Sequence, residues 1–489
     1  MGKGLYQHLI CRIHDAGDKV FIASEVGDYL YSDIDENAAK IQQVMMGVGV
    51  SKGSRVLVQV NKSPEAVMLY LACLRMGAIF VPLNTGYKQD EVEYFYGNAE
   101  PDLCVCEQET KDRFTCAKTV MAIDDLWQMA RQQSGDVEIT DLDGDDIAAI
   151  LYTSGTTGRS KGAMLSNDNL RSNVEVLSEY WQWSEDDVLL HILPIFHVHG
   201  LFVALHCALW TTNTVIFHNG YNPDNVIADL PKSTVMMGVP THYVRLLENE
   251  KFGRDVCKNM RLFLSGSAPL LTETFHEFEK VSGIKILERY GMTEAGMITS
   301  NPYDGDRVAG TVGFPLPDVD ARLGNIKDGK GVLEIKGPNV FKGYWRMPEK
   351  TAEEFTDDGY FITGDISIMD DEGRVSIVGR AKDLIITGGL NVYPKEIESL
   401  IDDMDGVKES AVIGVSHPDF GEGVTAIVVP DGSVEISEDI IINDTSEKLA
   451  SFKVPKRIYI VDELPRNTMG KVQKNALREE YAKIYGKEK

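Results

Sequence analysis

The alternation of helix and strand signals along the first half of the chain is the feature that most constrains its fold. One clear unit has Ser63 as a helix N-cap, Pro64 at the first helical position and a stop at Gly77. A buried-strand pattern follows over 78–81, and an earlier unit pairs a helix over 33–46 with a strand over 56–60. Such alternation is typical of a parallel sheet covered by helices. We therefore predict a doubly wound α/β fold.

Further strand patterns extend this α/β region, and the later part of the sequence then predicts shorter strands and tight turns. The additional candidate strands cover residues 147–152, 214–217, 234–238, 261–265 and 284–288. From about residue 308, short strands and tight Asp-Gly and Glu-Gly turns predict a small β-rich subdomain. A chain of 489 residues has room for two or three domains of about 150 residues. We expect a large N-terminal domain over 1–380 and a small α+β domain over 381–489.

The charge balance excludes several classes of partner. With 49 Lys and Arg against 75 Asp and Glu, the formal net charge is −26, which disfavours nucleic acid and anionic membranes. The long uncharged stretch at 188–210 contains four histidines, a proline and a glycine, which indicates core and a site loop rather than a membrane helix.

The cysteines and the N-terminus favour the cytoplasm. The seven cysteines are an odd number without framework spacing, and no signal-peptide pattern opens the chain. Cys104 and Cys106 are better explained by a buried strand than by a metal site, since no second Cys or His pair follows at ligand spacing.

A loop of small and hydroxyl residues follows the strand that ends near Thr153, and it predicts a phosphate site. The candidate phosphate-binding residues are Thr153, Ser154, Gly155, Thr156, Thr157 and Gly158, with Lys161 shortly after. Backbone N–H and side-chain O–H groups can surround phosphate oxygens here, while the lysine adds positive charge. The Gly-Lys-Ser/Thr ending of a P-loop nucleoside triphosphatase is absent, so that class is disfavoured.

Five motifs in this order resemble the adenylate-forming superfamily of acyl-CoA synthetases, luciferases and peptide-synthetase adenylation domains. They are the hydroxyl loop, Tyr-Gly-Met-Thr-Glu at 290–294, Tyr-Phe-Ile-Thr-Gly-Asp at 360–365, Gly-Arg at 379–380 and Pro-Arg-Asn-Thr-Met-Gly-Lys at 465–471. The resemblance covers nearly the whole chain. It implies that a substrate carboxylate attacks the α-phosphate of ATP to give acyl-AMP, after which the thiol of coenzyme A displaces AMP. Mg²⁺ is the implied cofactor.

The resemblance also implies roles for individual residues around the nucleotide. Thr293 would bind the α-phosphate, Glu294 would hold Mg²⁺, and Asp365 would accept hydrogen bonds from the ribose hydroxyls with help from Arg380. The adenine would lie between two sets of residues, namely Gly266, Ser267 and Ala268 on one side and Tyr290, Gly291 and Met292 on the other.

A mobile C-terminal domain follows from the same resemblance. The domain would rotate about a hinge at Lys382, so that Lys471 serves the adenylation step and then leaves the site. The loop of Gly388, Gly389 and Leu390 would replace it and line the tunnel for coenzyme A. The first step needs no general base, because a carboxylic acid with a pKa of about 4 is already ionised.

Three segments predict a cationic substrate pocket. The candidate residues are Arg245, Ser267, Arg289 and His199, with His197 at the position of the family's aromatic gate. A guanidinium group pairs a carboxylate bidentately, and a buried cation without such a partner is costly, so a short dicarboxylate would gain from these arginines. Alternatively, each arginine forms a structural ion pair, Arg245 with Glu248 and Arg289 with Glu288.

The wider segments around these motifs look like the malonyl-CoA synthetases of the superfamily. That branch implies malonate as substrate, with methylmalonate tolerated, and Ser160 fits it in place of the superfamily's usual proline. A short-chain or aryl monocarboxylate acyl-CoA synthetase would share every nucleotide residue, and an adenylation enzyme that serves a carrier protein is a second alternative. A nucleotide-binding protein without catalysis is disfavoured by the presence of Lys471 and Glu294. The oligomeric state, monomer or homodimer, stays open.

Overall fold

The computed structural model describes residues 4–87, 89–114, 117–153, 160–387, 390–417, 420–449, 451–467 and 470–485. The chain forms two compact units, and each is built from two stretches of sequence. The first unit comprises Met1–Ala321 and Ile335–Phe361, and the second comprises Arg322–Glu334 and Ile362–Lys489. The second unit therefore begins earlier in the chain than the expected domain boundary at residue 381. The proposed hinge at Lys382 stays a prediction.

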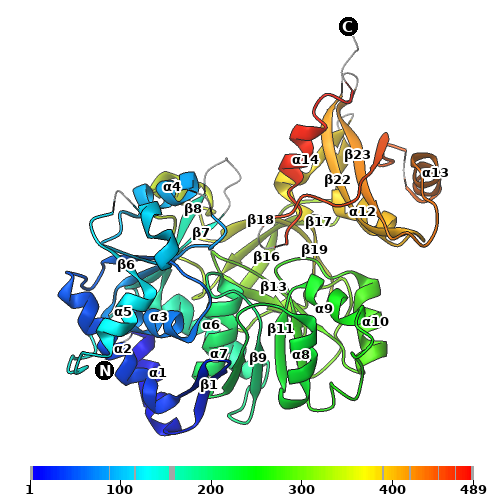
Figure 1. The fold of residues 1–489 in the computed structure, drawn as a ribbon. Helices are drawn as coiled ribbons and strands as arrows, with labels where there is room; N and C mark the ends of the chain where they lie inside the picture. Colours follow the sequence, from blue (N-terminus) through cyan, green and yellow to red (C-terminus); the bar gives the residue numbers. More distant parts are fainter. Residues whose placement is uncertain are drawn as a thin grey trace. The chain divides into compact units, whose positions relative to one another are not determined.

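A six-stranded sheet in the first unit has the order β6-β5-β3-β4-β7-β8, and β6, β7 and β8 are labelled in Figure 1. Its strands are β3 (Arg55–Gln59), β4 (Ile79–Pro82), β5 (Leu103–Cys106), β6 (Val120–Ala122), β7 (Ile147–Thr153) and β8 (Lys161–Ser166). The strands pair in parallel except for β8, which is antiparallel to β7. Leu57, Val81 and Ile150 form one core cluster with Val92 and Phe95 of helix α4, so α4 covers this face.

A nine-stranded sheet completes the first unit, in the order β15-β14-β13-β12-β11-β9-β10-β1-β2. Its strands are β1 (Val20–Ser24), β2 (Gly27–Leu30), β9 (Val188–His191), β10 (Thr214–Phe217), β11 (Val235–Gly238), β12 (Leu262–Ser265), β13 (Leu287–Met292), β14 (Gly296–Ser300) and β15 (Phe314–Pro315). The pairing from β13 to β1 is parallel, and the strands at both edges are antiparallel. The predicted doubly wound α/β class is confirmed.

The helices of the first unit connect and cover these strands. They are α1 (Leu5–Ala16), α2 (Tyr31–Gly47), α3 (Pro64–Met76), α4 (Gln89–Ala99), α5 (Ile123–Ala130), α6 (Asn167–Tyr180), α7 (His206–Trp210), α8 (Pro223–Asp229), α9 (Pro240–Leu247), α10 (Thr272–Ser282) and α11 (Pro348–Glu353). Three further helical segments that are not α-helices are η1 (Gln108–Phe114), η2 (His199–Leu205) and η3 (Leu230–Lys232). The caps of α3 are as predicted, since Ser63 accepts the Ala66 N–H and Gly77 has a φ of 74°.

Two sequence predictions need refinement. The strand expected over 284–288 begins at Leu287 and continues to Met292, because its pairing with β14 extends it through the Tyr-Gly-Met motif. The uncharged stretch at 188–210 contains β9, a loop, η2 and α7, and η2 is a π-helix that the sequence pattern did not indicate. No helix among the described residues has the length and apolar character needed to cross a membrane.

Two sheets form the β-rich region that the later part of the sequence predicts. The four-stranded sheet β16-β17-β18-β19 is built from β16 (Asp320–Lys327), β17 (Lys330–Lys336), β18 (Phe361–Met369) and β19 (Val375–Arg380). The other contains β20 (Ile385–Thr387), β21 (Leu390–Val392), β22 (Val407–His417), β23 (Gly421–Pro430) and β24 (Arg457–Ile460). Helices α12 (Pro394–Asp402), α13 (Glu438–Lys448) and α14 (Lys474–Glu480), with the short η4 (Ala381–Asp383), complete this α+β part.

Candidate active site

A tight turn between β13 and β14 carries Thr293 and Glu294. Glu294 is only 6% exposed, and its carboxylate oxygen Oε1 accepts hydrogen bonds from Tyr344 Oη at 3.0 Å and from Thr153 Oγ1 at 3.5 Å. The main-chain N–H of Phe341 donates to the Glu294 carbonyl oxygen at 2.7 Å. The predicted metal ligand is therefore held both by its side chain and by its main chain. Tyr344 is a site residue that sequence reasoning missed, because nothing near it in the sequence links it to Glu294.

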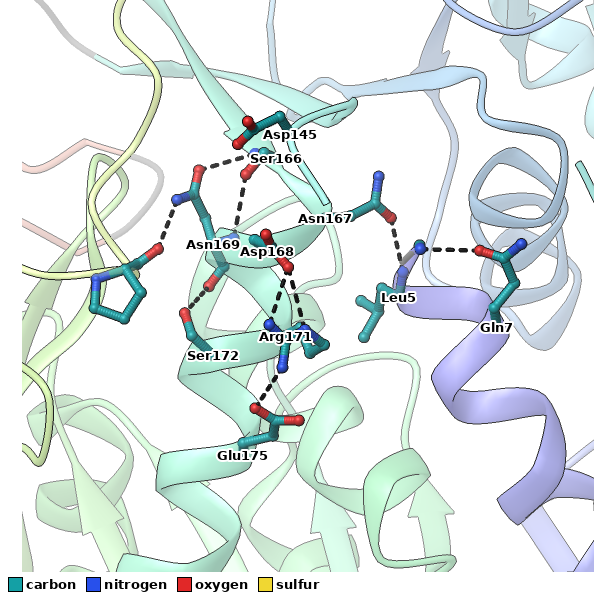
Figure 2. A network of polar contacts seen from close by, with 12 residues as sticks. Leu5, Gln7, Asp145, Ser166, Asn167, Asp168, Asn169, Arg171, Ser172 and Glu175 are labelled. Carbon is teal, nitrogen blue, oxygen red and sulfur yellow. Dashed lines mark hydrogen bonds and ion pairs between the residues drawn. The ribbon is translucent and has the colours of Figure 1, made fainter. Parts of the chain in front are cut away.

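Three buried asparagines, Asn169, Asn173 and Asn339, fasten this turn to its surroundings. Figure 2 shows Asn169 at the start of α6, bonded to Ser166 of the helix cap. Asn339 donates to Ala295 O at 2.8 Å and Asn173 donates to Met297 O at 3.0 Å, both on the β14 side of the turn. Asn169 donates to Pro338 O and Val340 O at 2.8 Å each, and so holds the segment that carries Asn339. The sequence offers no signal for these contacts, since each joins segments that are far apart in the chain.

Thr153 and Lys161 are register partners at the ends of β7 and β8, on either side of the hydroxyl loop. The candidate loop residues Ser154, Gly155, Thr156, Thr157 and Gly158 lie outside the described residues. Lys161 is buried, its Nζ lies 3.1 Å from Glu354 Oε1, and the same atom lies 4.2 Å from the centroid of the Tyr344 ring. The structure thus places the Lys161 ammonium beside the tyrosine that binds Glu294, and its role in phosphate binding stays a prediction.

The candidate adenine segment, Gly266 to Ala268, directly follows β12. Ser267 has a φ of 68°, a left-handed conformation that is uncommon for a residue with a side chain. Such strain persists only where the surroundings impose it, and it is frequent at functional sites. Tyr290, Gly291 and Met292 lie on β13, and the Tyr290 side chain is half-buried with its hydroxyl 3.9 Å from the Met292 sulfur.

Arg289, Ser267 and His199, three of the candidate pocket residues, lie near one another, and their role in substrate binding stays a prediction. Arg289 is only 3% exposed, and its Nε and Nη2 atoms are buried with no hydrogen-bond partner among the described residues. Burial lowers the pKa of Arg289 to about 10, so the guanidinium is charged at neutral pH. Its packing against Gly266 is close enough that a Cβ on residue 266 would lie 2.2 Å from Arg289 Nη1.

His199 completes this cluster through a contact with Ser267. Its Nδ1 lies 3.3 Å from Ser267 Oγ, and its buried Nε2 has no partner in the described part of the chain. Burial lowers the pKa of His199 well below its usual range, and the nearby charge of Arg289 lowers it further. A neutral imidazole beside a guanidinium can donate one hydrogen bond to an anion that the guanidinium pairs.

Arg245 and His197 lie at the margin of the cluster. Arg245 is exposed on α9, and no hydrogen bond or ion pair joins it to Glu248 or to any other residue that the structure describes. Arg289 likewise forms no ion pair with Glu288 in these ranges, and the Glu288 carboxylate accepts the main-chain N–H of Leu270 at 3.2 Å. The half-buried His197 accepts the His199 N–H at 3.4 Å through Nδ1. The contribution of Arg245 to the pocket stays a prediction.

The second unit carries the remaining candidate residues. Asp365 is buried on β18 and pairs with Arg380 of β19, with the Nε and Oδ1 atoms 2.6 Å apart. Lys382 is exposed in η4, and Lys471 is exposed next to the left-handed Gly470. Leu390 begins β21, while Gly388 and Gly389 lie outside the described residues. The structure thus joins Asp365 and Arg380 by an ion pair, and the roles of Lys382, Lys471 and Leu390 stay predictions.

Comparison with known proteins gives a consistent result over the whole chain. The model of the AMP-binding enzyme family matches residues 12–345, and that of the AMP-binding enzyme C-terminal domain matches residues 396–471. The malonate–CoA ligase of Arabidopsis thaliana is 32% identical, over 94% of this chain and 86% of its own length. The mitochondrial malonate–CoA ligase of Mus musculus is 33% identical, over 94% and 88%.

A solved structure shares the fold closely. The structure of ATP-bound MatB from Rhodopseudomonas palustris has 49% sequence identity and a TM-score of 0.96, covering 99% of this chain and 100% of that one.

Proposed function

Because the chain belongs to the family of AMP-binding enzymes, we propose that it ligates malonate to coenzyme A through a malonyl-AMP intermediate, with release of AMP and pyrophosphate. It is an AMP-forming acid–thiol ligase, and ATP and coenzyme A are its cosubstrates. Methylmalonate is a second candidate substrate because it carries the same two carboxylates.

The observation that carries this proposal is the buried edge of Arg289, whose Nε and Nη2 have no hydrogen-bond partner in the described ranges. An apolar acyl chain would leave the buried Nε–H and Nη2–H groups without acceptors, and each such loss costs about 1–3 kcal/mol. The second carboxylate of malonate accepts both hydrogen bonds at once, as guanidinium and carboxylate geometry allows. Ser267 and the neutral His199 supply further donors to that carboxylate. A monocarboxylate substrate is therefore not favoured.

The reacting carboxylate needs position more than it needs a base. Malonate is fully ionised at neutral pH, so the attack on the α-phosphate depends on holding the two groups in line and on balancing phosphate charge. In the proposal, Thr293, the hydroxyl loop and Lys471 bind the phosphates, while Asp365 and Arg380 hold the ribose. Lys382 is the hinge, and Gly388 to Leu390 line the path of coenzyme A.

The Glu294 carboxylate fits a magnesium site that the phosphates of the substrate would complete. Mg²⁺ is usually held by one or two carboxylates together with substrate phosphates, and Glu294 is such a buried carboxylate. The described residues contain no group of three or more His, Cys, Asp or Glu side chains that could hold a metal alone. Bound at Glu294, Mg²⁺ would supply neutralisation of phosphate charge. A cytoplasmic location, and the choice between monomer and homodimer, stay predictions.

A direct test is the release of AMP in the presence of ATP, Mg²⁺ and coenzyme A, with a panel of acids at one concentration. The panel is malonate, methylmalonate, succinate, acetate, butyrate and benzoate. Preference for malonate over acetate and butyrate supports the dicarboxylate pocket. Preference for a monocarboxylate refutes the dicarboxylate pocket. AMP release that needs a carrier protein instead of coenzyme A refutes coenzyme A as the acyl acceptor.

A further inference from the structure

His191 is a buried histidine at the end of β9 that has no part in the proposed reaction. It is 1% exposed, and its Nε2 lies 2.9 Å from the carbonyl oxygen of Gly200. A carbonyl can only accept, so Nε2 carries the proton and donates it. The ring stacks on Phe217, with centroids 5.5 Å apart and planes 15° from parallel. Its Nδ1 has no hydrogen-bond partner among the residues described.

The acceptor of this bond lies in the first turn of η2, next to His199. The turn is crowded, because a Cβ on residue 200 would lie 2.1 Å from the Pro194 carbonyl oxygen. Glycine therefore allows the helix to begin against this loop. A π-helix is a rare, wide turn that often marks a functional site, and it needs support from its surroundings. His191 supplies such support by bonding a main-chain oxygen of that turn.

His191 is itself held in place by a third segment of the chain. Lys62, which precedes the N-cap of α3, donates from Nζ to the His191 carbonyl oxygen at 2.8 Å. The same ammonium lies 4.3 Å from the centroid of the Phe217 ring that stacks on His191. Both the main chain and the ring of His191 are thereby fixed. The side chain can transmit that fixed position to Gly200.

The residue next to Gly200 is the one whose direction matters for the substrate. His199 must keep its Nδ1 near Ser267 Oγ, and its buried Nε2, which has no partner in the part of the chain that the structure describes, within reach of the Arg289 charge. A small rotation of the first turn of η2 would move both nitrogens. We propose that His191 is a positioning residue for malonate specificity, which fixes the Gly200 carbonyl and so directs His199 towards the far carboxylate. The inference rests on the proposed function.

The test compares three purified full-length variants in the AMP-release assay. His191→Leu removes the donor, and His191→Gln keeps an N–H near the position of Nε2. The matched control is His206→Leu. His206 is equally buried, and this substitution also removes one side-chain hydrogen bond, the one between His206 Nε2 and Tyr70 Oη at 2.7 Å. We expect His191→Leu to raise the malonate KM about tenfold with the ATP KM unchanged, and His191→Gln to stay within about twofold of wild type.

A second comparison tests the route through His199. In the His199→Gln background, His191→Leu should have little further effect on the malonate KM, because the residue that it positions is gone. Equal effects of His191→Leu and His206→Leu, an equal rise of both KM values, or full additivity with His199→Gln would each overturn the inference. Should His191→Leu fail to fold, His191→Asn takes its place, since that shorter amide cannot reach Gly200.

The kinetics of the wild-type enzyme distinguish a failure of the His191 positioning role from a failure of the proposed function. Wild-type activity with malonate, combined with unchanged kinetics of the His191 variants, overturns the positioning role alone. A wild-type enzyme that prefers a monocarboxylate overturns the proposed function, and the positioning role falls with it.

Discussion

Replacing Arg289 with methionine should affect substrate use and stability in opposite directions. The guanidinium is 3% exposed, and two of its nitrogen atoms have no hydrogen-bond partner among the described residues. Removing one partner of a buried, hydrogen-bonded ion pair costs about 3–5 kcal/mol. We therefore expect kcat/KM for malonate to fall by a factor of about one hundred or more, with the ATP KM little changed.

The effect on stability follows from the pKa of Arg289, which burial lowers from its ordinary value to about 10. At about 1.4 kcal/mol per pKa unit, the folded protein holds this charge at a cost of about 3 kcal/mol. A folded-state pKa below the unfolded one means that the cost is fully present below about pH 10 and disappears only as the pH rises above 10 towards the ordinary arginine pKa. Methionine carries no charge and fills much of the space, so Arg289→Met should stabilise the ligand-free enzyme by about 1–3 kcal/mol at pH 7.

Thermal denaturation with and without malonate measures both effects. The wild type should gain stability when malonate is added, and Arg289→Met should start higher but gain nothing. Arg307→Met is a suitable control, because the Arg307 guanidinium already donates to the carbonyl oxygens of Pro302, Tyr303 and Lys285, and its loss should destabilise. An Arg289→Met enzyme that is less stable than wild type yet binds malonate normally would refute the reasoning.

Three further predictions address other parts of the molecule. Lys471→Ala should abolish adenylation but spare thioester formation from supplied malonyl-AMP, as two half-reaction assays will show; equal loss of both would contradict the exchange of Lys471 for another loop. Tyr344→Phe removes the 3.0 Å hydrogen bond to Glu294 and should lower the adenylation rate about tenfold, with a higher Mg²⁺ requirement but unchanged thiolysis. Burial raises the pKa of Asp402 to about 6, so its contribution to stability is present below about pH 4 and lost as the pH rises through 6. Asp402→Asn should therefore raise the denaturation midpoint at pH 8 but not at pH 4, and the same increase at both pH values would argue against this titration.

The parts of the fold that could be predicted are those that depend on neighbours in the sequence. Ser63 and Gly77 cap α3 through groups three or four residues away, so their residue types announce the helix ends. The extension of β13 to Met292 depends instead on pairing with β14, and the division after Phe361 depends on which strands pack together. Neither leaves a local pattern in the sequence.

The same distinction applies to the candidate site. Arg289 stands out in the sequence because it precedes a recognisable motif, but its unpaired nitrogen atoms are a property of the folded surroundings. Tyr344 and Asn339 reach Glu294 and Ala295 across 50 and 44 residues, which no spacing rule connects. The π-helix at His199 requires the close approach of Gly200 to Pro194, and an apolar stretch alone cannot distinguish it from an α-helix.

The contact between Gly266 and Arg289 restricts the order in which this pocket can evolve. A methyl group at residue 266 would lie 2.2 Å from Arg289 Nη1, so alanine there is damaging as long as the arginine is present. Once residue 289 has become shorter, the same alanine is accommodated and fills the vacated space. The arginine can then no longer return by a single substitution. A lineage that loses recognition of the second carboxylate in this way cannot regain it by reverting residue 289 alone. Laboratory evolution towards bulkier acids should therefore find substitutions at 289 before those at 266.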